Sequence, residues 1–323
     1  MSHPPICALL DDYQNAALSC ADWTALDGKI DLRRFDHHLG SMDEIAAALA
    51  PCSIVVAMRE RTAFPAELLA RLPNLKLLIT TGQRNRSIDV AAAHDLGITV
   101  CGTRSGTGPA AELAWGGLLA LMRRIPQEMR NLQQSGPWQT SLGRSLEGRK
   151  LGVVGLGKQG ARMVRYGQAF GMEVCGWTRT DLTNRSAELG VTPLPIETLF
   201  STCDVVAMQL ALTDQTRGIV GRNLLRSMRA DAVLVNAARG GLIDETALIE
   251  ALQQGRISGA VLDVFDQEPL PADHPFRSLS NVIATPHIGY ATQENYRVFY
   301  GDVVETIEHW LRGTVLRPLT PAS

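Results

Sequence analysis

The sequence predicts an α/β protein with two doubly wound parallel-sheet domains, and three observations support this fold class. The chain has 323 residues, a length typical of two domains. Short apolar runs alternate with helix-like stretches over the N-terminal third, and the same alternation begins again at Lys150. Hydrophobic residues make up 45% of the chain and charged residues 20%, so there is enough apolar surface for packed cores.

In the N-terminal third, each expected strand is a short run of apolar residues. Such runs are typical of strands buried on both faces, and they lie at residues 6–10, 53–57, 75–79 and 97–100. Helical patterns at 43–49 and 66–72 lie between them, and a further helix is expected at 110–124. Strands that alternate with helices in this way form a parallel sheet.

The second series has the same character and leads to a C-terminal helix. Its expected strands lie at residues 151–154, 173–177, 204–208, 232–236, 259–262 and 282–284. Val298, Val303 and Ile307 recur at helical spacing, which predicts an amphipathic helix at 293–312.

Charge and cysteine usage exclude several classes of protein. The formal net charge is −2, which argues against a nucleic-acid or anionic-membrane partner. No apolar run reaches the roughly 20 residues that span a bilayer, and the N-terminus does not resemble a signal peptide. The six cysteines form no CxxC pair, so no metal site and no disulfide framework is expected. Reduced thiols predict a cytoplasmic protein.

A glycine-rich loop follows the strand at 151–154 and precedes a helix expected at 161–170. It reads GLGKQG, with Gly155, Gly157 and Gly160 in the spacing of a dinucleotide-binding turn. The first glycine permits the tight turn, the second lets the backbone approach a pyrophosphate, and the third lets the helix pack close to the sheet. The intervening Lys158 and Gln159 are expected to contact the cofactor. An ordinary strand–helix turn is the alternative, and the strand–loop–helix context disfavours it.

The end of the strand at 173–177 predicts which dinucleotide binds. The residue that reads the adenosine ribose usually lies about 20 residues past the glycine-rich loop. Here Thr178 carries no charge that would repel a 2′-phosphate, and Arg179 can pair with one. The sequence therefore favours NADP(H) over NAD(H), with Asp181 expected to be a solvated turn residue.

Three further segments each follow a strand and carry one residue suited to acid–base or anion chemistry. They are NAARGGLID at 236–244, LDVFDQEPL at 262–270 and TPHIG at 285–289, which contain Arg239, Glu268 and His287. The carboxyl ends of parallel strands meet at one sheet edge, so these residues are expected beside the glycine-rich loop. Each alone has a plain structural reading, as a surface charge or a turn residue, but together they indicate a site.

The chemistry of this trio fits hydride transfer between a nicotinamide and a small 2-keto or 2-hydroxy acid. His287 is expected to give a proton to the carbonyl oxygen, because histidine titrates near neutral pH. Glu268 would favour the protonated imidazole, and Arg239 would hold the substrate carboxylate and polarise the carbonyl. The cofactor supplies the hydride, and the protein orients it.

With these four segments, the sequence resembles the D-isomer-specific 2-hydroxyacid dehydrogenase family, which includes glyoxylate/hydroxypyruvate reductases and phosphoglycerate dehydrogenases. The resemblance implies that Arg239, Glu268 and His287 are the catalytic trio. It implies that Asp263 faces the nicotinamide carboxamide and that Ala237 contributes backbone. It also implies a substrate-binding loop composed largely of backbone N–H groups, formed by Thr81, Gly82, Gln83 and Arg84.

The resemblance further implies a Rossmann cofactor domain inserted into a discontinuous, flavodoxin-like substrate domain. The expected ranges are 103–286 for the cofactor domain, and 1–102 with 287–323 for the substrate domain. Family members are usually homodimers, so a homodimer is expected. The substrate would be a small acid such as glyoxylate or hydroxypyruvate.

The sequence departs from the family pattern in places, and other functions stay open. The substrate loop is less glycine-rich and more basic than in many relatives, and Gln209 stands where many have histidine. One alternative is a dehydrogenase for a different small acid, such as formate or a phosphonate-type substrate. Another is a dinucleotide-sensing binding protein, such as a transcriptional corepressor with this fold. Turnover of glyoxylate and hydroxypyruvate would discriminate the binding protein from the enzyme.

Overall fold

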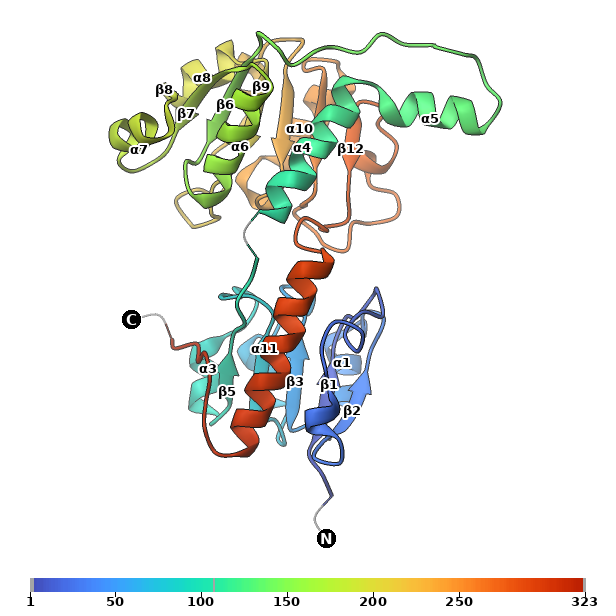
Figure 1. The fold of residues 1–323 in the computed structure, drawn as a ribbon, viewed down its shortest axis with the longest axis vertical. Helices are drawn as coiled ribbons and strands as arrows, with labels where there is room; N and C mark the ends of the chain where they lie inside the picture. The colour runs from blue at the N-terminus through green and yellow to red at the C-terminus, as the bar shows by residue number, and fades with distance from the viewer. Residues whose placement is uncertain (1–2, 107, 322–323) are drawn as a thin grey trace. The chain divides into compact units, whose positions relative to one another are not determined.

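The chain folds into two compact units. The computed structural model describes residues 3–106 and 108–321, and residues 1, 2, 107, 322 and 323 of the expected domain ranges lie outside them. Unit 1 comprises residues 1–106 and 291–323, and unit 2 comprises residues 107–290 (Figure 1). The boundaries between the units follow residues 106 and 290 in the structure. The sequence predicts them after residues 102 and 286. Unit 2 is therefore an insertion in the chain of unit 1.

Unit 1 has a five-stranded parallel sheet in the order β2-β1-β3-β4-β5. This is the flavodoxin-like strand order, with the first strand inside the sheet. Its strands are β1 (Ile6–Leu9), β2 (Asp31–Arg34), β3 (Ile54–Ala57), β4 (Leu77–Thr80) and β5 (Thr99–Cys101). Its helices are η1 (Thr24–Leu26), α1 (Met42–Leu49), α2 (Ala66–Ala70), α3 (Val90–Asp95) and α11 (Gln293–Leu311).

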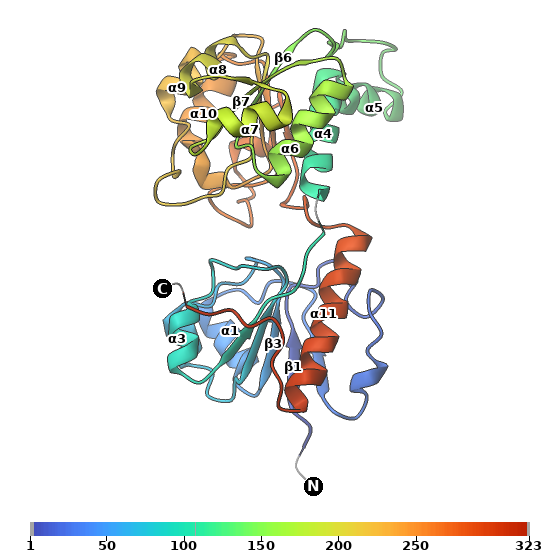
Figure 2. The same cartoon turned by 60° about the vertical axis from the view of Figure 1, so that its left-hand side comes forward.

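The central strands of unit 1 are apolar on both faces because helices cover both faces. Alternate residues such as Val55 and Leu78 join the core formed with α1, α2 and α3. The opposite side of the sheet faces α11, which buries Phe299, Val303 and Ile307 (Figures 1 and 2). The C-terminal helix thus completes the core of unit 1, and its period of apolar residues confirms the helix expected at 293–312.

Unit 2 has a seven-stranded parallel sheet in the order β12-β11-β10-β9-β6-β7-β8. Its strands are β6 (Lys150–Val154), β7 (Glu173–Trp177), β8 (Thr192–Pro193), β9 (Val205–Met208), β10 (Val233–Asn236), β11 (Gly259–Leu262) and β12 (Val282–Ala284). The first strand, β6, lies between β7 and β9, so the direction of winding reverses there. In such sheets ligands bind outside the carboxyl ends of the strands at this reversal.

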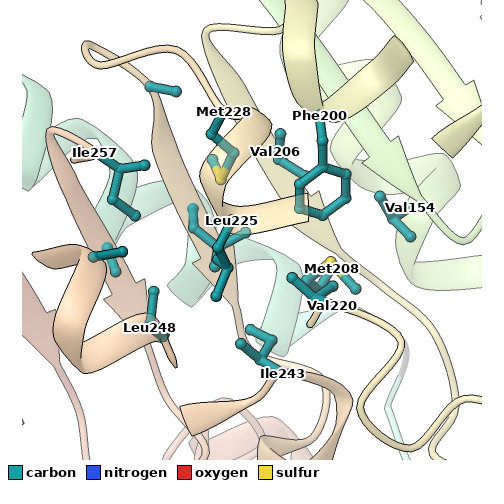
Figure 3. Packing of buried hydrophobic residues seen from close by; sticks show 14 of the residues in the cluster. Val154, Phe200, Val206, Met208, Val220, Leu225, Met228, Ile243, Leu248 and Ile257 are labelled. Carbon is teal, nitrogen blue, oxygen red and sulfur yellow. The ribbon is translucent and has the colours of Figure 1, made fainter. Parts of the chain in front are cut away.

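Helices cover both faces of the unit 2 sheet. They are α4 (Pro109–Met122), α6 (Lys158–Ala169), α7 (Leu182–Leu189), α8 (Ile196–Thr202), α9 (Arg222–Ser227) and α10 (Glu245–Gln253). The unit also contains α5 (Ile125–Gln133), which does not pack on the sheet, and the short turns η2 (Gly240–Leu242) and η3 (Pro275–Arg277). On one face Val206 and Met208 pack with Phe200 of α8, Leu225 of α9 and Leu248 of α10 (Figure 3). On the other face the alternate strand residues pack against α4 and α6. This two-sided burial explains the continuous apolar runs in the sequence.

The structure confirms the predicted fold class and most of the expected elements, and it adds some. Helix α6 begins at Lys158 and not at residue 161, because Gly157 is its N-cap. Strand β2 was not expected: it lies at the sheet edge and its sequence, DLRR, has no apolar run. Helix α5 and the segment after it extend away from the unit 2 sheet (Figures 1 and 2).

Candidate active site

Three neighbouring strands of unit 2 bring the predicted catalytic residues to one sheet edge. Strands β10, β11 and β12 are paired in parallel, so the loops after them leave from the same edge. Arg239 lies in the loop after β10, Glu268 in the loop after β11 and His287 in the loop after β12. The parallel register, not proximity in sequence, therefore brings the three loops together.

Glu268 and His287 form a direct hydrogen-bonded pair. The Nδ1 atom of His287 lies 2.6 Å from Oε2 of Glu268. Both side chains stay partly accessible, at 21% for His287 and 33% for Glu268, so a ligand can reach them. The other carboxylate oxygen of Glu268 accepts a hydrogen bond from the Phe265 N–H at 2.9 Å, which fixes its orientation. The edge of the Tyr290 ring packs against the imidazole, with ring centroids 5.7 Å apart.

Asp263, at the end of β11, holds the loop that carries His287. Its carboxylate accepts hydrogen bonds from the Thr285 hydroxyl at 2.6 Å, the Ile288 N–H at 2.9 Å and the Gly289 N–H at 2.7 Å. Burial raises the pKa of Asp263, and these hydrogen bonds oppose that shift by stabilising the carboxylate. His287 itself has a φ of 51°, in the left-handed region that few side chains adopt. The anchored loop keeps the imidazole in this conformation, a strain that is common at functional sites.

The turn that carries Arg239 is held by its neighbour Asn236, which is buried. The Asn236 side chain accepts from the Ala238 N–H at 3.1 Å and donates to the Arg239 carbonyl at 2.9 Å. The next residue, Gly240, lies against the backbone of the Glu268 loop, where a Cβ atom would be 2.2 Å from the Phe265 carbonyl. No larger residue fits there, so the loops of Arg239 and Glu268 are in backbone contact.

The glycine-rich loop has the shape that a dinucleotide pyrophosphate requires. Gly155 has a φ of 106°, which permits the tight turn after β6. A Cβ atom on Gly160 would lie 1.9 Å from the Gly155 carbonyl oxygen, so a side chain there would displace the loop. Gly157 is the N-cap of α6, and a Cβ atom there would meet nothing within 4 Å. The loop therefore presents the open N-terminus of a twelve-residue helix, a suitable site for an anion.

Two buried amide groups beside this loop also fit a polar ligand. Within residues 3–106 and 108–321, the side-chain oxygen of Gln159 and the side-chain nitrogen of Gln209 are buried without a hydrogen-bond partner. Gln209 follows β9, next to β6 at the reversal of the sheet, and its backbone abuts Gly155. Buried polar groups are normally paired, so these two are candidates for cofactor contacts. The residues present thus fit a bound nicotinamide dinucleotide.

The residues expected to read the adenosine ribose lie at the end of β7. Thr178 is half-buried and Arg179 is exposed, and the Arg179 guanidinium donates to the side-chain oxygen of Gln215. Asp181 is exposed and has a φ of 52°, and it accepts a hydrogen bond from Asn184. The structure adds Arg185 of α7, which donates to the Leu156 carbonyl at 2.8 Å and so holds the glycine-rich loop. Its helical surface position gave the sequence reasoning no signal.

The expected substrate loop, residues 81–84, lies in unit 1 at the end of β4. Two of its four N–H groups are used internally, since Thr81 donates to the Ala57 carbonyl and Gly82 to the Thr103 hydroxyl. Gln83 and Arg84 are exposed, and their N–H groups donate no hydrogen bond within the part of the chain that the structure describes.

Arg59, which the sequence analysis missed, lies beside this loop. It follows β3 with a φ of 54°, and its guanidinium packs where a Cβ atom of Gly82 would be. It also donates to the Thr81 carbonyl at 3.4 Å. A charged residue at the end of a buried strand was the available signal.

The fold and this site define a dinucleotide-binding protein of the α/β class, and comparison with known proteins gives the family. Residues 115–289 match the model of the D-isomer specific 2-hydroxyacid dehydrogenase, NAD binding domain. The chain belongs to the D-isomer specific 2-hydroxyacid dehydrogenase family. No helix among the described residues is long and apolar enough to cross a membrane.

Individual relatives support the same assignment. The chain is 38% identical over 263 residues to a D-3-phosphoglycerate dehydrogenase from Methanocaldococcus jannaschii, an alignment that covers 80% of this chain and 50% of that protein. It is 35% identical over 288 residues to a hydroxypyruvate reductase from Thermotoga maritima, covering 87% and 92% respectively. The solved structure of a phosphoglycerate oxidoreductase from Vibrio cholerae o395 is similar with a TM-score of 0.91 and 34% identity, covering 96% and 100%. The chain spans about half the length of the D-3-phosphoglycerate dehydrogenases that it matches.

Proposed function

We propose that this protein reduces a small 2-keto acid to the D-2-hydroxy acid, and catalyses the reverse oxidation, with a nicotinamide dinucleotide as hydride carrier. The observation that carries the proposal is the 2.6 Å hydrogen bond between His287 and Glu268 at the sheet edge that also bears Arg239. A carboxylate on one ring nitrogen is the arrangement that an acid–base histidine needs. Relatives named hydroxypyruvate reductase and glyoxylate reductase support a keto-acid substrate.

The geometry supports a distinct role for each ring nitrogen of His287 in this proposal. Nδ1 of His287 is held by Glu268, so Nε2 is the ring nitrogen that donates the proton to the substrate carbonyl oxygen during reduction. The Glu268 carboxylate stabilises the imidazolium that reduction requires. In oxidation the neutral imidazole takes the proton back. A bound nicotinamide supplies or accepts the hydride.

Arg239 binds the substrate carboxylate. A guanidinium offers two parallel donors that match the two oxygens of a carboxylate, which orients the substrate as well as neutralising its charge. The two hydrogen bonds of the Asn236 side chain and the backbone contact at Gly240 fix the turn that carries Arg239. The substrate is a small acid of the glyoxylate or hydroxypyruvate type, and we propose that loop 81–84 with Arg59 contributes to its selection.

The first prediction concerns turnover and Arg239. The wild type should reduce glyoxylate or hydroxypyruvate in a panel of 2-keto acids assayed with NADH and NADPH. The change Arg239→Lys keeps the positive charge but removes the two parallel donors of the guanidinium. The kcat/KM for the keto acid should therefore fall by at least about a hundredfold, while the affinity for the dinucleotide is nearly unchanged. Absence of turnover with every acid, together with tight dinucleotide binding, would support the dinucleotide-sensing protein instead. Equal losses of substrate and dinucleotide affinity would contradict the role of Arg239.

We propose that the preferred cofactor is NADP(H). Thr178 places no carboxylate at the position that binds ribose hydroxyls, and the exposed Arg179 follows it directly. The hydrogen bond to Gln215 holds the Arg179 guanidinium over the loop after β9. An arginine in this place can pair with a 2′-phosphate by charge-assisted hydrogen bonds.

The second prediction tests this preference. The wild type should have a higher kcat/KM with NADPH than with NADH, and Arg179→Ala should reduce that ratio by about tenfold or more, the cost of one charge-assisted phosphate contact. Arg256→Ala, at an exposed position elsewhere on unit 2, is the matched control and should leave the ratio unchanged. A wild type that prefers NADH, or an unchanged ratio in Arg179→Ala, would show that Arg179 does not read the phosphate.

We propose that the protein is a homodimer that associates through the arm formed by α5 and residues 134–145. The polar side chains of the arm bind one another, since Glu128 accepts from Thr140 and Ser141. The large apolar side chains of the arm are exposed: Ile125 (43%), Met129 (52%), Leu132 (67%), Trp138 (77%) and Leu142 (94%). Several large apolar side chains exposed on one short segment favour an interface, and a second copy of the same arm would cover them symmetrically.

The third prediction is that charge on this surface separates the copies. Met129→Glu combined with Leu132→Glu should convert a dimer into a monomer in sedimentation velocity at micromolar concentration, because association would bury two unpaired charges per arm. Leu96→Glu, at a position in unit 1 that is 47% exposed, is the control and should remain dimeric. A wild type that sediments as a monomer would contradict the proposal.

A further inference from the structure

A second carboxylate–imidazole pair lies beside the Glu268 loop, and the proposed chemistry does not use it. Glu245 is the first residue of α10, and its Oε1 atom lies 3.2 Å from Nε2 of His274. Its other oxygen accepts a hydrogen bond from the Asp266 N–H at 3.2 Å. The side chain of Glu245 is 20% exposed and that of His274 is 14% exposed, each less than its counterpart in the Glu268–His287 pair. One carboxylate thus connects α10 to both ends of the segment 266–274.

The hydrogen bonds of His274 define its tautomer. Nδ1 accepts from the Phe276 N–H at 3.3 Å, so the proton of the neutral ring is on Nε2 and is donated to Glu245. The ring also packs on Phe276, with centroids 4.9 Å apart, and Phe276 packs on Phe265 at 6.1 Å. His274 is therefore held on three sides and acts as a fixed donor to Glu245.

Two carboxylates accept hydrogen bonds from two consecutive backbone N–H groups of the same turn. Glu268 accepts from Phe265 N–H at 2.9 Å, and Glu245 accepts from the next N–H, that of Asp266. At this same point the backbone of Gly240 lies against the Phe265 carbonyl. The position of the turn, and with it the distance from Glu268 to the loops of Arg239 and His287, therefore depends on Glu245.

We propose that Glu245 and His274 are positioning residues for the reaction, which hold the turn at 265–268 so that the Glu268 carboxylate faces His287. The inference rests on the proposed function, because it assumes that the Glu268–His287 pair carries the proton. Neither residue touches the reacting atoms. Their effect is on the geometry of a pair whose two atoms are 2.6 Å apart, and a displacement of about 1 Å at such a site can cost about a hundredfold in rate.

Other charged groups face these pairs and set the background for a pH experiment. Burial raises the pKa of Asp266, and the neighbouring carboxylates of Glu245 and Asp244 raise it further, while Arg217 lowers it. Around His287 the charged groups are Glu268 and the buried Asp263. Asp244, Asp263, Asp266 and Arg217 are unchanged in the variants below. A change in the pH profile therefore reports the Glu245–His274 pair, here called the brace, or the Glu268–His287 pair.

The experiment measures kcat and KM for keto-acid reduction against pH, with melting temperatures, in wild type and variants. Glu245→Ala and His274→Ala should lower kcat by about tenfold to a hundredfold with little change in KM. They should also move the alkaline fall-off of reduction to lower pH, because imidazolium loses part of its carboxylate partner. Glu268→Gln should move it in the same direction and at least as far. His274→Gln retains a side-chain N–H donor and should recover most of the lost kcat.

A double variant and a matched control make the test decisive. Glu245→Ala combined with Glu268→Gln should have the same fall-off as Glu268→Gln alone, because the brace acts only through Glu268. Glu250→Ala removes a surface ion pair with Arg222 from the same helix and should leave the profile unchanged. If Glu268→Gln shifts the fall-off and the brace variants change only the melting temperature, the inference is wrong and the proposed function stands. If Glu268→Gln shifts nothing, both are wrong.

Discussion

The buried carboxylate of Asp263 is the interaction on which the rest of the site depends. It lies at the end of β11 and accepts three hydrogen bonds from the loop after β12, two of them from backbone N–H groups. Hydrogen bonds to a charged acceptor contribute roughly 1.5–3 kcal/mol each, enough to hold His287 at its positive φ. In this conformation Nδ1 of the imidazole lies 2.6 Å from Oε2 of Glu268. Without this anchor, the parallel register of β11 and β12 would bring the two loops close but would not aim the ring.

The sequence could predict the strands and the positions of Arg239, Glu268 and His287, because both depend on local patterns. Buried parallel strands are apolar throughout, and the residues that follow them meet at one edge whatever their distance in sequence. Strand β2 and helix α5 were not predicted from the sequence, because neither buries an apolar face. Strand β2 is an edge strand with charged residues, and α5 buries none of its side chains. Asn236, Arg59 and Glu245 were missed for another reason. Their roles consist of a few hydrogen bonds or packing contacts with loops, and such contacts leave no periodic signal.

The two carboxylate–imidazole pairs of unit 2 have the same chemistry, and we propose that they serve two different purposes. In the Glu268–His287 pair the second ring nitrogen is not used by the carboxylate, and both side chains stay accessible. In the Glu245–His274 pair both ring nitrogens are engaged by the protein, and the side chains are more enclosed. Occupation of the second ring nitrogen thus distinguishes the pair that we propose to carry the proton from the pair that we propose to position it, where residue type alone does not.

The role of His287 in forming a D-2-hydroxy acid can be measured by chiral analysis of the product. Wild-type protein and His287→Asn are each mixed in single turnover with a 2-keto acid and the reduced dinucleotide, and the 2-hydroxy acid is resolved into its isomers. Asparagine tolerates the left-handed backbone of this position, so the loop should keep its shape while the proton donor is lost. The wild type should form the D isomer, and His287→Asn should react more slowly by orders of magnitude while it retains its affinity for the dinucleotide. Formation of the L isomer, or turnover by His287→Asn at the wild-type rate, would contradict the proposed function.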